Sequence, residues 1–135
     1  MNYSKLTLLI PAKEDTDCLL HVLEELKNFD VEKIIVIPKE DELPKDWKFE
    51  KMTVINQSNN GYGNALIEGI KNIKTDFFCI FNADGSFKPS ELAGMLNLTK
   101  DFDFIFGSRY LKDAKSDDDT IITSFGNYLF SKIGR

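Results

Sequence analysis

The chain has 135 residues and a formal net charge of −5. Its length suits one domain, and its acidic balance argues against a general nucleic-acid binder. No apolar segment approaches the roughly 20 residues that span a bilayer, and the first residues do not have the pattern of a signal peptide. We therefore expect a cytoplasmic protein whose two cysteines, Cys18 and Cys79, are small buried residues in a reducing compartment.

Apolar runs and helical periods alternate along the chain. Strands are predicted, in chain order, at 6–11, 33–38, 52–56, 77–81 and 102–106. Helices are predicted at 16–28, 62–73, 90–99 and 121–133. The alternation predicts an α/β fold, a three-layer sandwich with a mostly parallel sheet and helices on both faces, as a single domain over residues 1–135. The charged stretch 39–51 is predicted to be a surface excursion whose Trp47 and Phe49 cover the core.

The segment 77–85 carries the most specific local pattern. Its apolar run predicts a strand buried on both faces, which stops at Asn82-Ala83-Asp84-Gly85. Ligands of open α/β sheets bind beyond the carboxyl ends of the strands. Oxygen atoms of Asn82 and Asp84 could hold a hard cation such as Mg²⁺ there. An ordinary turn is the alternative, because Asn, Asp and Gly all favour turns.

Four segments are expected to meet at that edge of the sheet. They follow the first, third, fourth and fifth predicted strands, at residues 10–15, 60–65, 82–84 and 107–110. Each segment alone is compatible with a plain turn or a surface charge. Their joint order and spacing form a more specific signal.

This order resembles the nucleotide-binding half of family 2 glycosyltransferases, inverting enzymes of the GT-A fold. Within the family it looks most like the dolichyl- or polyprenyl-phosphate mannose synthase type. The family elements Pro-x-x-Asn-Glu, Gly-x-Gly-x-Ala, Asp-x-Asp, Pro-x-Glu-Leu and Gly-Ser-Arg-Tyr are similar to residues 11–15, 61–65, 82–84, 89–92 and 107–110.

The resemblance implies a hexosyltransferase that moves a sugar from a nucleotide-diphosphate sugar to an acceptor by metal-assisted inverting displacement. It implies donor contacts from Pro11, Ala12, Glu14, Asp15, Gly61, Gly63, Asn82, Ala83 and Asp84. A divalent cation, Mg²⁺ or Mn²⁺, would be held by Asp84 and Asn82, and Ser108 and Arg109 would contact a phosphate of the donor or the acceptor. A role in cell-envelope or glycan biosynthesis would follow.

The resemblance leaves the acceptor and the catalytic base open. A polyprenyl phosphate needs no protein base, because a phosphate monoester is already ionised near neutral pH. A hydroxyl acceptor requires a carboxylate as general base, and no residue is assigned to that role. The family usually continues beyond the position of Arg135 with acceptor-binding elements, so we expect the acceptor part to be missing and this chain alone to transfer sugar poorly.

Two further departures from the family pattern keep alternatives open. Asn82 stands in place of the first Asp of the metal motif, and Pro38-Lys39 stands where an acidic pair commonly helps to recognise the base. A non-catalytic or degenerate nucleotide-sugar-binding module is therefore the main alternative. A haloacid-dehalogenase-type phosphatase would need a nucleophilic Asp at position 82. A sugar-phosphate nucleotidyltransferase would need a glycine-rich, Arg-containing loop after the first strand.

The predicted helix 121–133 carries an apolar stripe at spacings of three and four. Its members are Ile122, Phe125, Leu129 and Ile133. The stripe could dock on the domain's own sheet, pack on a missing C-terminal part, or contact the cytoplasmic face of a membrane. If it stays exposed, we expect self-association into a homo-oligomer.

Overall fold

The computed structural model describes residues 3–13 and 16–107, and it divides the chain into two compact units, 1–102 and 103–135. Every helix and strand of the described residues lies in the first unit. The strands are β1 (Leu6–Pro11), β2 (Glu32–Ile37), β3 (Met52–Asn56) and β4 (Phe77–Ile80). The helices are α1 (Thr16–Glu25), η1 (Leu26–Asn28), α2 (Tyr62–Ile70), η2 (Pro89–Glu91) and α3 (Leu92–Leu98).

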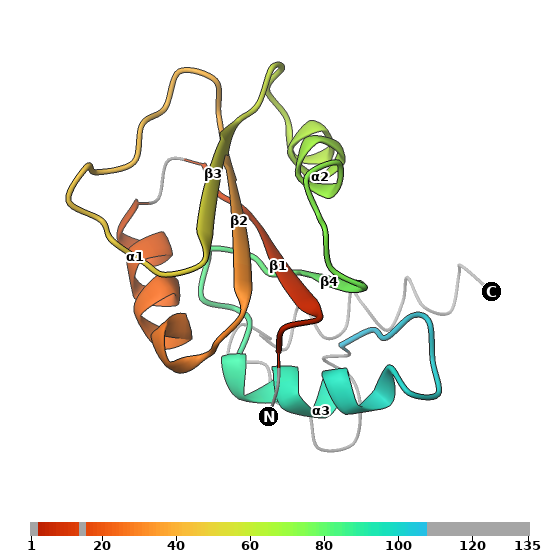
Figure 1. The fold of residues 1–135 in the computed structure, drawn as a ribbon. Helices are drawn as coiled ribbons and strands as arrows, with labels where there is room; N and C mark the ends of the chain where they lie inside the picture. Colours follow the sequence, from red (N-terminus) through yellow and green to blue (C-terminus); the bar gives the residue numbers. More distant parts are fainter. Residues whose placement is uncertain (1–2, 14–15, 108–135) are drawn as a thin grey trace, which may run out of the picture. The chain divides into compact units, whose positions relative to one another are not determined.

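The four strands form one parallel sheet in the order β3-β2-β1-β4 (Figure 1). Central strand β1 pairs with β2 on one side and with β4 on the other, so that Leu9 lies opposite both Ile34 and Ile80. Parallel neighbours need crossover connections, and here α1 connects β1 to β2 while α2 connects β3 to β4. The prediction of an α/β fold with a mostly parallel sheet is confirmed.

Alternate residues of the strands build two cores, one on each face of the sheet. Leu8 and Ile10 of β1 pack with α1 and with Leu92 at the start of α3. Leu9 points the other way and packs with Val36 and with Ala65 of α2. This alternation follows from the two-residue period of a strand. The result is three layers, with α2 and α1 on opposite faces of the sheet (Figure 1).

The segment between β2 and β3 covers part of the first core. Leu43, Trp47 and Phe49 are partly buried against it, and the rings of Trp47 and Phe49 meet edge to face with centroids 6.1 Å apart. The prediction that these two aromatic residues cover the core is confirmed.

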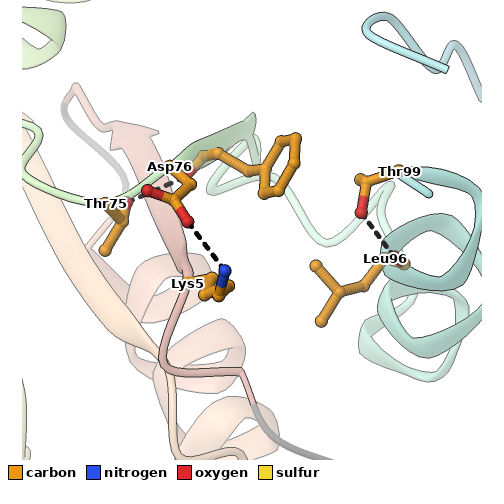
Figure 2. A network of polar contacts seen from close by, with 6 residues as sticks. Lys5, Thr75, Asp76, Leu96 and Thr99 are labelled. Atoms are coloured by element: carbon orange, nitrogen blue, oxygen red, sulfur yellow. Dashed lines mark hydrogen bonds and ion pairs between the residues drawn. The ribbon is translucent and has the colours of Figure 1, made fainter.

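Polar contacts hold β4 against β1 at the amino end of the sheet. The Thr75 hydroxyl lies 2.7 Å from the Thr7 hydroxyl and donates to the Phe77 carbonyl at 2.8 Å. Lys5 forms an ion pair of 3.1 Å with Asp76 (Figure 2). These contacts help to fix the register of β4 against β1. They lie at the amino ends of the strands, opposite the carboxyl ends.

Two predictions about apolar segments are wrong. Residues 102–106 form no strand, and Phe104 and Phe106 are 81% and 86% exposed. The composition favours a strand, but a strand needs a hydrogen-bonded neighbour and a face to bury. The strand β4 is not buried on both faces, because it is an edge strand among the described residues and Phe78 is 45% exposed.

Cys18 and Cys79 are not disulfide-bonded and are only partly buried, and burial raises the pKa of the Cys79 thiol. Within residues 3–13 and 16–107, no helix has the length and hydrophobicity needed to cross a membrane. The predicted helix 121–133 lies outside the described residues.

Candidate functional site

Two adjoining hollows lie where the four parallel strands end. The larger has a volume of about 540 Å³ and the smaller about 230 Å³. The larger volume falls in the range of small-molecule sites, which is about 300–1,000 Å³. Tyr62 and residues 11–13 line both hollows, so they are two parts of one candidate site.

Most of the lining residues come from three of the four segments that the sequence singled out. The larger pocket is lined by Pro11, Ala12, Lys13, Val36, Pro38, Gln57, Asn60, Gly61, Tyr62 and Ala65. The smaller pocket is lined by Pro11, Ala12, Lys13, Tyr62, Asn82, Ala83 and Asp84. The structure thus brings together the segments that follow β1, β3 and β4, because parallel strands place their carboxyl ends at one edge.

The three glycines in and next to α2 differ in whether the structure requires a glycine at their position. Gly61, the residue before α2, has φ +130°, a conformation that other residues rarely adopt. Gly69 faces the sheet, where an added Cβ would lie 2.2 Å from Leu9 Cδ1. Gly63 has neither constraint, since no atom lies within 4 Å of the position its Cβ would take. The protein's own packing therefore does not require a glycine at position 63.

The segment after β4 is a turn that also lines the smaller pocket. Asp84 Oδ1 accepts hydrogen bonds from the backbone N–H of Ser86 at 2.9 Å and from its hydroxyl at 2.6 Å. Gly85 has φ +74°, as such a turn needs. The Tyr62 hydroxyl donates to Asn82 Oδ1 at 3.3 Å, which connects the start of α2 to this turn. The segment is therefore a turn, as the alternative interpretation predicted. Asn82 and Asp84 of this turn also line the smaller pocket.

A polar network fastens the loop between β3 and α2. The Glu68 carboxylate accepts hydrogen bonds from the Ser58 hydroxyl at 2.5 Å and from the Ser58 N–H at 3.0 Å. It also accepts one from Asn64 Nδ2 at 2.6 Å, and the same amide donates to the Asn59 carbonyl. Helix α2 thereby holds the loop that carries Asn60 and Gly61 to the larger pocket.

We expect the network to make the free energy of unfolding depend on pH. The hydrogen bonds from the Ser58 hydroxyl, the Ser58 N–H and Asn64 hold the pKa of Glu68 below its usual value of 4.5. A lowered pKa contributes stability that is present above the usual value and is lost as the pH falls through the folded value. We expect Glu68→Gln to lower the free energy of unfolding at pH 7 and to flatten its fall between about pH 5 and 3. Urea unfolding at a series of pH values measures both, and parallel pH profiles of variant and wild type would contradict the prediction.

The donor set at the smaller pocket fits a cation that is shared with a substrate. Asp84 is the carboxylate among the residues that line it, and Asn82 adds an amide oxygen. Among the described residues, no three His, Cys, Asp or Glu side chains gather into a metal-binding group. Mg²⁺ is commonly held by one or two carboxylates together with substrate phosphates, and this set meets that minimum.

The structure locates some of the expected site residues at the pockets and does not describe others. Pro11, Ala12, Gly61, Asn82, Ala83 and Asp84 line the two pockets. Gly63 lies in the first turn of α2 without lining either. Glu14, Asp15, Ser108 and Arg109 lie outside the described residues, so their roles stay predictions.

Sequence reasoning assigned no role to several residues that line the pockets. These are Lys13, Val36, Pro38, Gln57, Asn60, Tyr62 and Ala65. Except for Val36, which lies near the end of β2, they follow a strand or lie in the first turn of α2, and this position was the signal that could have identified them. Lys13 brings a positive charge to both hollows.

The model of the family described as glycosyl transferase family 2 matches residues 7–134. The chain belongs to glycosyltransferase family 2. No curated protein and no solved structure gives a significant match.

Family membership bears on what the domain binds. A family 2 glycosyltransferase domain binds a nucleotide-sugar donor, and divalent cations are common in the family. The predicted membership of family 2 is confirmed, and a glycosyltransferase function in general is supported. The acceptor, the sugar and the mechanism belong to the proposal that follows.

Proposed function

We propose that this domain binds a nucleotide-diphosphate sugar across the two hollows and transfers its sugar to an acceptor with inversion. The observation that carries the proposal is that the motif segments after β1, β3 and β4 line one continuous site. The larger hollow would take the nucleoside, and the smaller would take the diphosphate. A volume of about 540 Å³ is sufficient for a nucleoside.

Several groups favour an anionic ligand in the smaller hollow. Lys13 lines it, and the first turn of α2 begins beside it at Gly61-Tyr62. The amino end of a helix attracts phosphate through its N–H groups and its dipole. Asp84 and Asn82 would hold a divalent cation, which when bound neutralises charge on the diphosphate leaving group. Glu14 and Asp15 would contact the ribose or base.

The acceptor would be a group that is already a nucleophile. Asp84 is the carboxylate among the described residues that line the two hollows, and we assign it to the cation rather than to proton abstraction. A phosphate monoester such as a polyprenyl phosphate needs no base, and Ser108 and Arg109 would contact its phosphate. Such an acceptor would bring a cytoplasmic protein to the inner face of a membrane.

The glycine at position 63 provides one test. Gly63→Ala adds a methyl group in open space inside a helix, so we expect unchanged or slightly higher stability, by up to about 1 kcal/mol. If the donor approaches the backbone here, the same methyl group should weaken donor binding about tenfold, equivalent to about 1.4 kcal/mol. Thermal unfolding and calorimetry with UDP- and GDP-sugars measure the two effects separately. Unchanged affinity would remove Gly63 from the donor site.

The proposal as a whole is tested by binding and then by turnover. Calorimetry of the chain with UDP- and GDP-sugars, with and without Mn²⁺, should show binding that Mn²⁺ strengthens. Incubation with radiolabelled donor and polyprenyl phosphate then tests transfer. Donor binding without transfer to any acceptor would favour the non-catalytic module, and no binding of any nucleotide sugar would overturn the proposal.

A further inference from the structure

Gln57 has an unusual position for a polar residue of this domain. It directly follows β3, and its backbone N–H donates to the Ile37 carbonyl at 2.9 Å, which extends the pairing with β2. Gln57 is among the residues that line the larger pocket, although it is only 4% exposed. Its Oε1 atom is buried and has no hydrogen-bond partner.

An unpaired buried amide oxygen is costly for the protein. Native structures pair the large majority of buried side-chain polar atoms, because an unsatisfied group has given up its hydrogen bonds to water. Among the side chains that the structure describes, Gln57 is the one with a buried oxygen or nitrogen that lacks a partner. A group that is costly in the free protein and lies at a pocket is a candidate ligand contact.

The neighbouring amide shows the contrast. The Asn56 Nδ2 atom lies within hydrogen-bond distance of three carbonyl oxygens in the segment 38–41, the shortest contact being 2.7 Å to Asp41. It therefore holds in place the segment that carries Pro38, one wall of the larger pocket. The amide of Asn56 has a structural role, whereas the fold makes no such use of Gln57 Oε1.

The surroundings of Gln57 suit a flat, partly apolar ring. Val36, Pro38 and Ala65 give the larger pocket apolar walls beside Gln57. Ligand pockets typically combine apolar walls with a few polar groups that fix orientation. A nucleobase has apolar faces and a polar edge, and each of the common bases carries an N–H on that edge.

We infer that Gln57 reads the base of the nucleotide donor: its side-chain amide turns toward the larger pocket, and Oε1 then accepts a hydrogen bond from an N–H on the edge of the base. The inference rests on the proposed function, because it assigns the nucleoside to the larger pocket. The N–H can come from the ring, as in uracil and guanine, or from an exocyclic amine, as in adenine and cytosine. In the occupied site, the bond would satisfy the oxygen that the free protein leaves unpaired.

The test uses the apolar, nearly isosteric variant Gln57→Met. We measure binding of UDP, GDP, ADP and CDP to the full 135-residue chain, with pyrophosphate as the probe that lacks a base. The variant should bind the preferred nucleotide about tenfold more weakly, the value of one hydrogen bond, and should bind pyrophosphate within about twofold of wild type. UDP, whose base has only a ring N–H on this edge, and ADP and CDP, whose bases have only an amine, distinguish the two donors.

Thermal stability supplies the second readout. Removing an unpaired buried oxygen should raise the unfolding temperature of the free protein, whereas a structural role would lower it. Gln57→Leu repeats the test with a different apolar shape in case methionine does not pack. Unchanged nucleotide affinity, equal losses for nucleotide and pyrophosphate, or a lower unfolding temperature in both variants would overturn the inference.

Wild-type binding separates this inference from the proposed function. If wild type binds nucleotides no better than pyrophosphate, the base is not read, and the inference falls while a diphosphate site remains. If wild type binds neither nucleotides nor nucleotide sugars, the proposed function fails, and the inference fails with it.

Discussion

Asp84→Asn should abolish the Mn²⁺-dependent part of nucleotide-sugar binding. The substitution removes the carboxylate that lines the smaller pocket but retains an Oδ1 atom that can still accept the hydrogen bonds of Ser86. Mutation of residues that merely hydrogen-bond to metal ligands commonly lowers metal affinity 10- to 100-fold. We therefore expect the increase in nucleotide-sugar affinity that Mn²⁺ causes to fall by at least about tenfold. Calorimetry with and without Mn²⁺ measures it.

Two further variants distinguish the effect of the Asp84 charge from the effect of its hydrogen bonds to Ser86 in the turn. Asp84→Ala removes both the charge and the acceptor for Ser86, whereas Asn82→Asp adds a carboxylate beside Asp84. If the charge matters, Asp84→Asn and Asp84→Ala lose Mn²⁺ dependence equally, and Asn82→Asp tightens metal binding. If only Asp84→Ala loses it, the residue acts through the turn and the assignment of a metal ligand is wrong.

Gly69→Ala should destabilise the domain and disturb the site at the other end of α2. Its Cβ would lie 2.2 Å from Leu9 Cδ1 and 3.1 Å from Val36 Cγ2, and both of these residues are buried in the core beneath α2. Overpacking of this kind costs about 1–3 kcal/mol, which outweighs the gain of up to about 1 kcal/mol from the helix propensity of alanine. Urea unfolding measures the loss, and a shift of α2 should also weaken donor binding.

The matched control is Gly94→Ala in α3, where the added Cβ would meet no atom within 4 Å. We expect it to retain or slightly increase stability. The double variant Gly69→Ala with Leu9→Val nearly conserves the total volume, so it should recover part of the loss. If Gly69→Ala is as stable as Gly94→Ala, Leu9 has room to move and the packing argument is wrong.

The element types and their order could be predicted from sequence where apolar patterns are long and clearly bounded. Strand β3 occupies Met52–Asn56, the same residues as predicted. Helix α2 ends at Ile70 instead of 73, since the next residues turn and the Asn72 side chain donates to the Glu68 carbonyl at 2.9 Å. Residues 102–106 have a strand-like composition but form no strand. A strand depends on a neighbour far away in sequence, which a local pattern does not contain.

The sequence by itself determined that the segments after β1, β3 and β4 meet, because parallel strands must place their carboxyl ends at one edge of the sheet. Only the tertiary structure decided what each residue does there. Gly63 and Gly69 look alike in sequence, yet one has open space and the other touches Leu9. Asn56 and Gln57 are adjacent amides, yet one is hydrogen-bonded to the loop 38–41 and the other is left with an unpaired oxygen at the pocket. Such differences depend on distances between residues that are distant in the chain, and these distances exist only once the layers have packed.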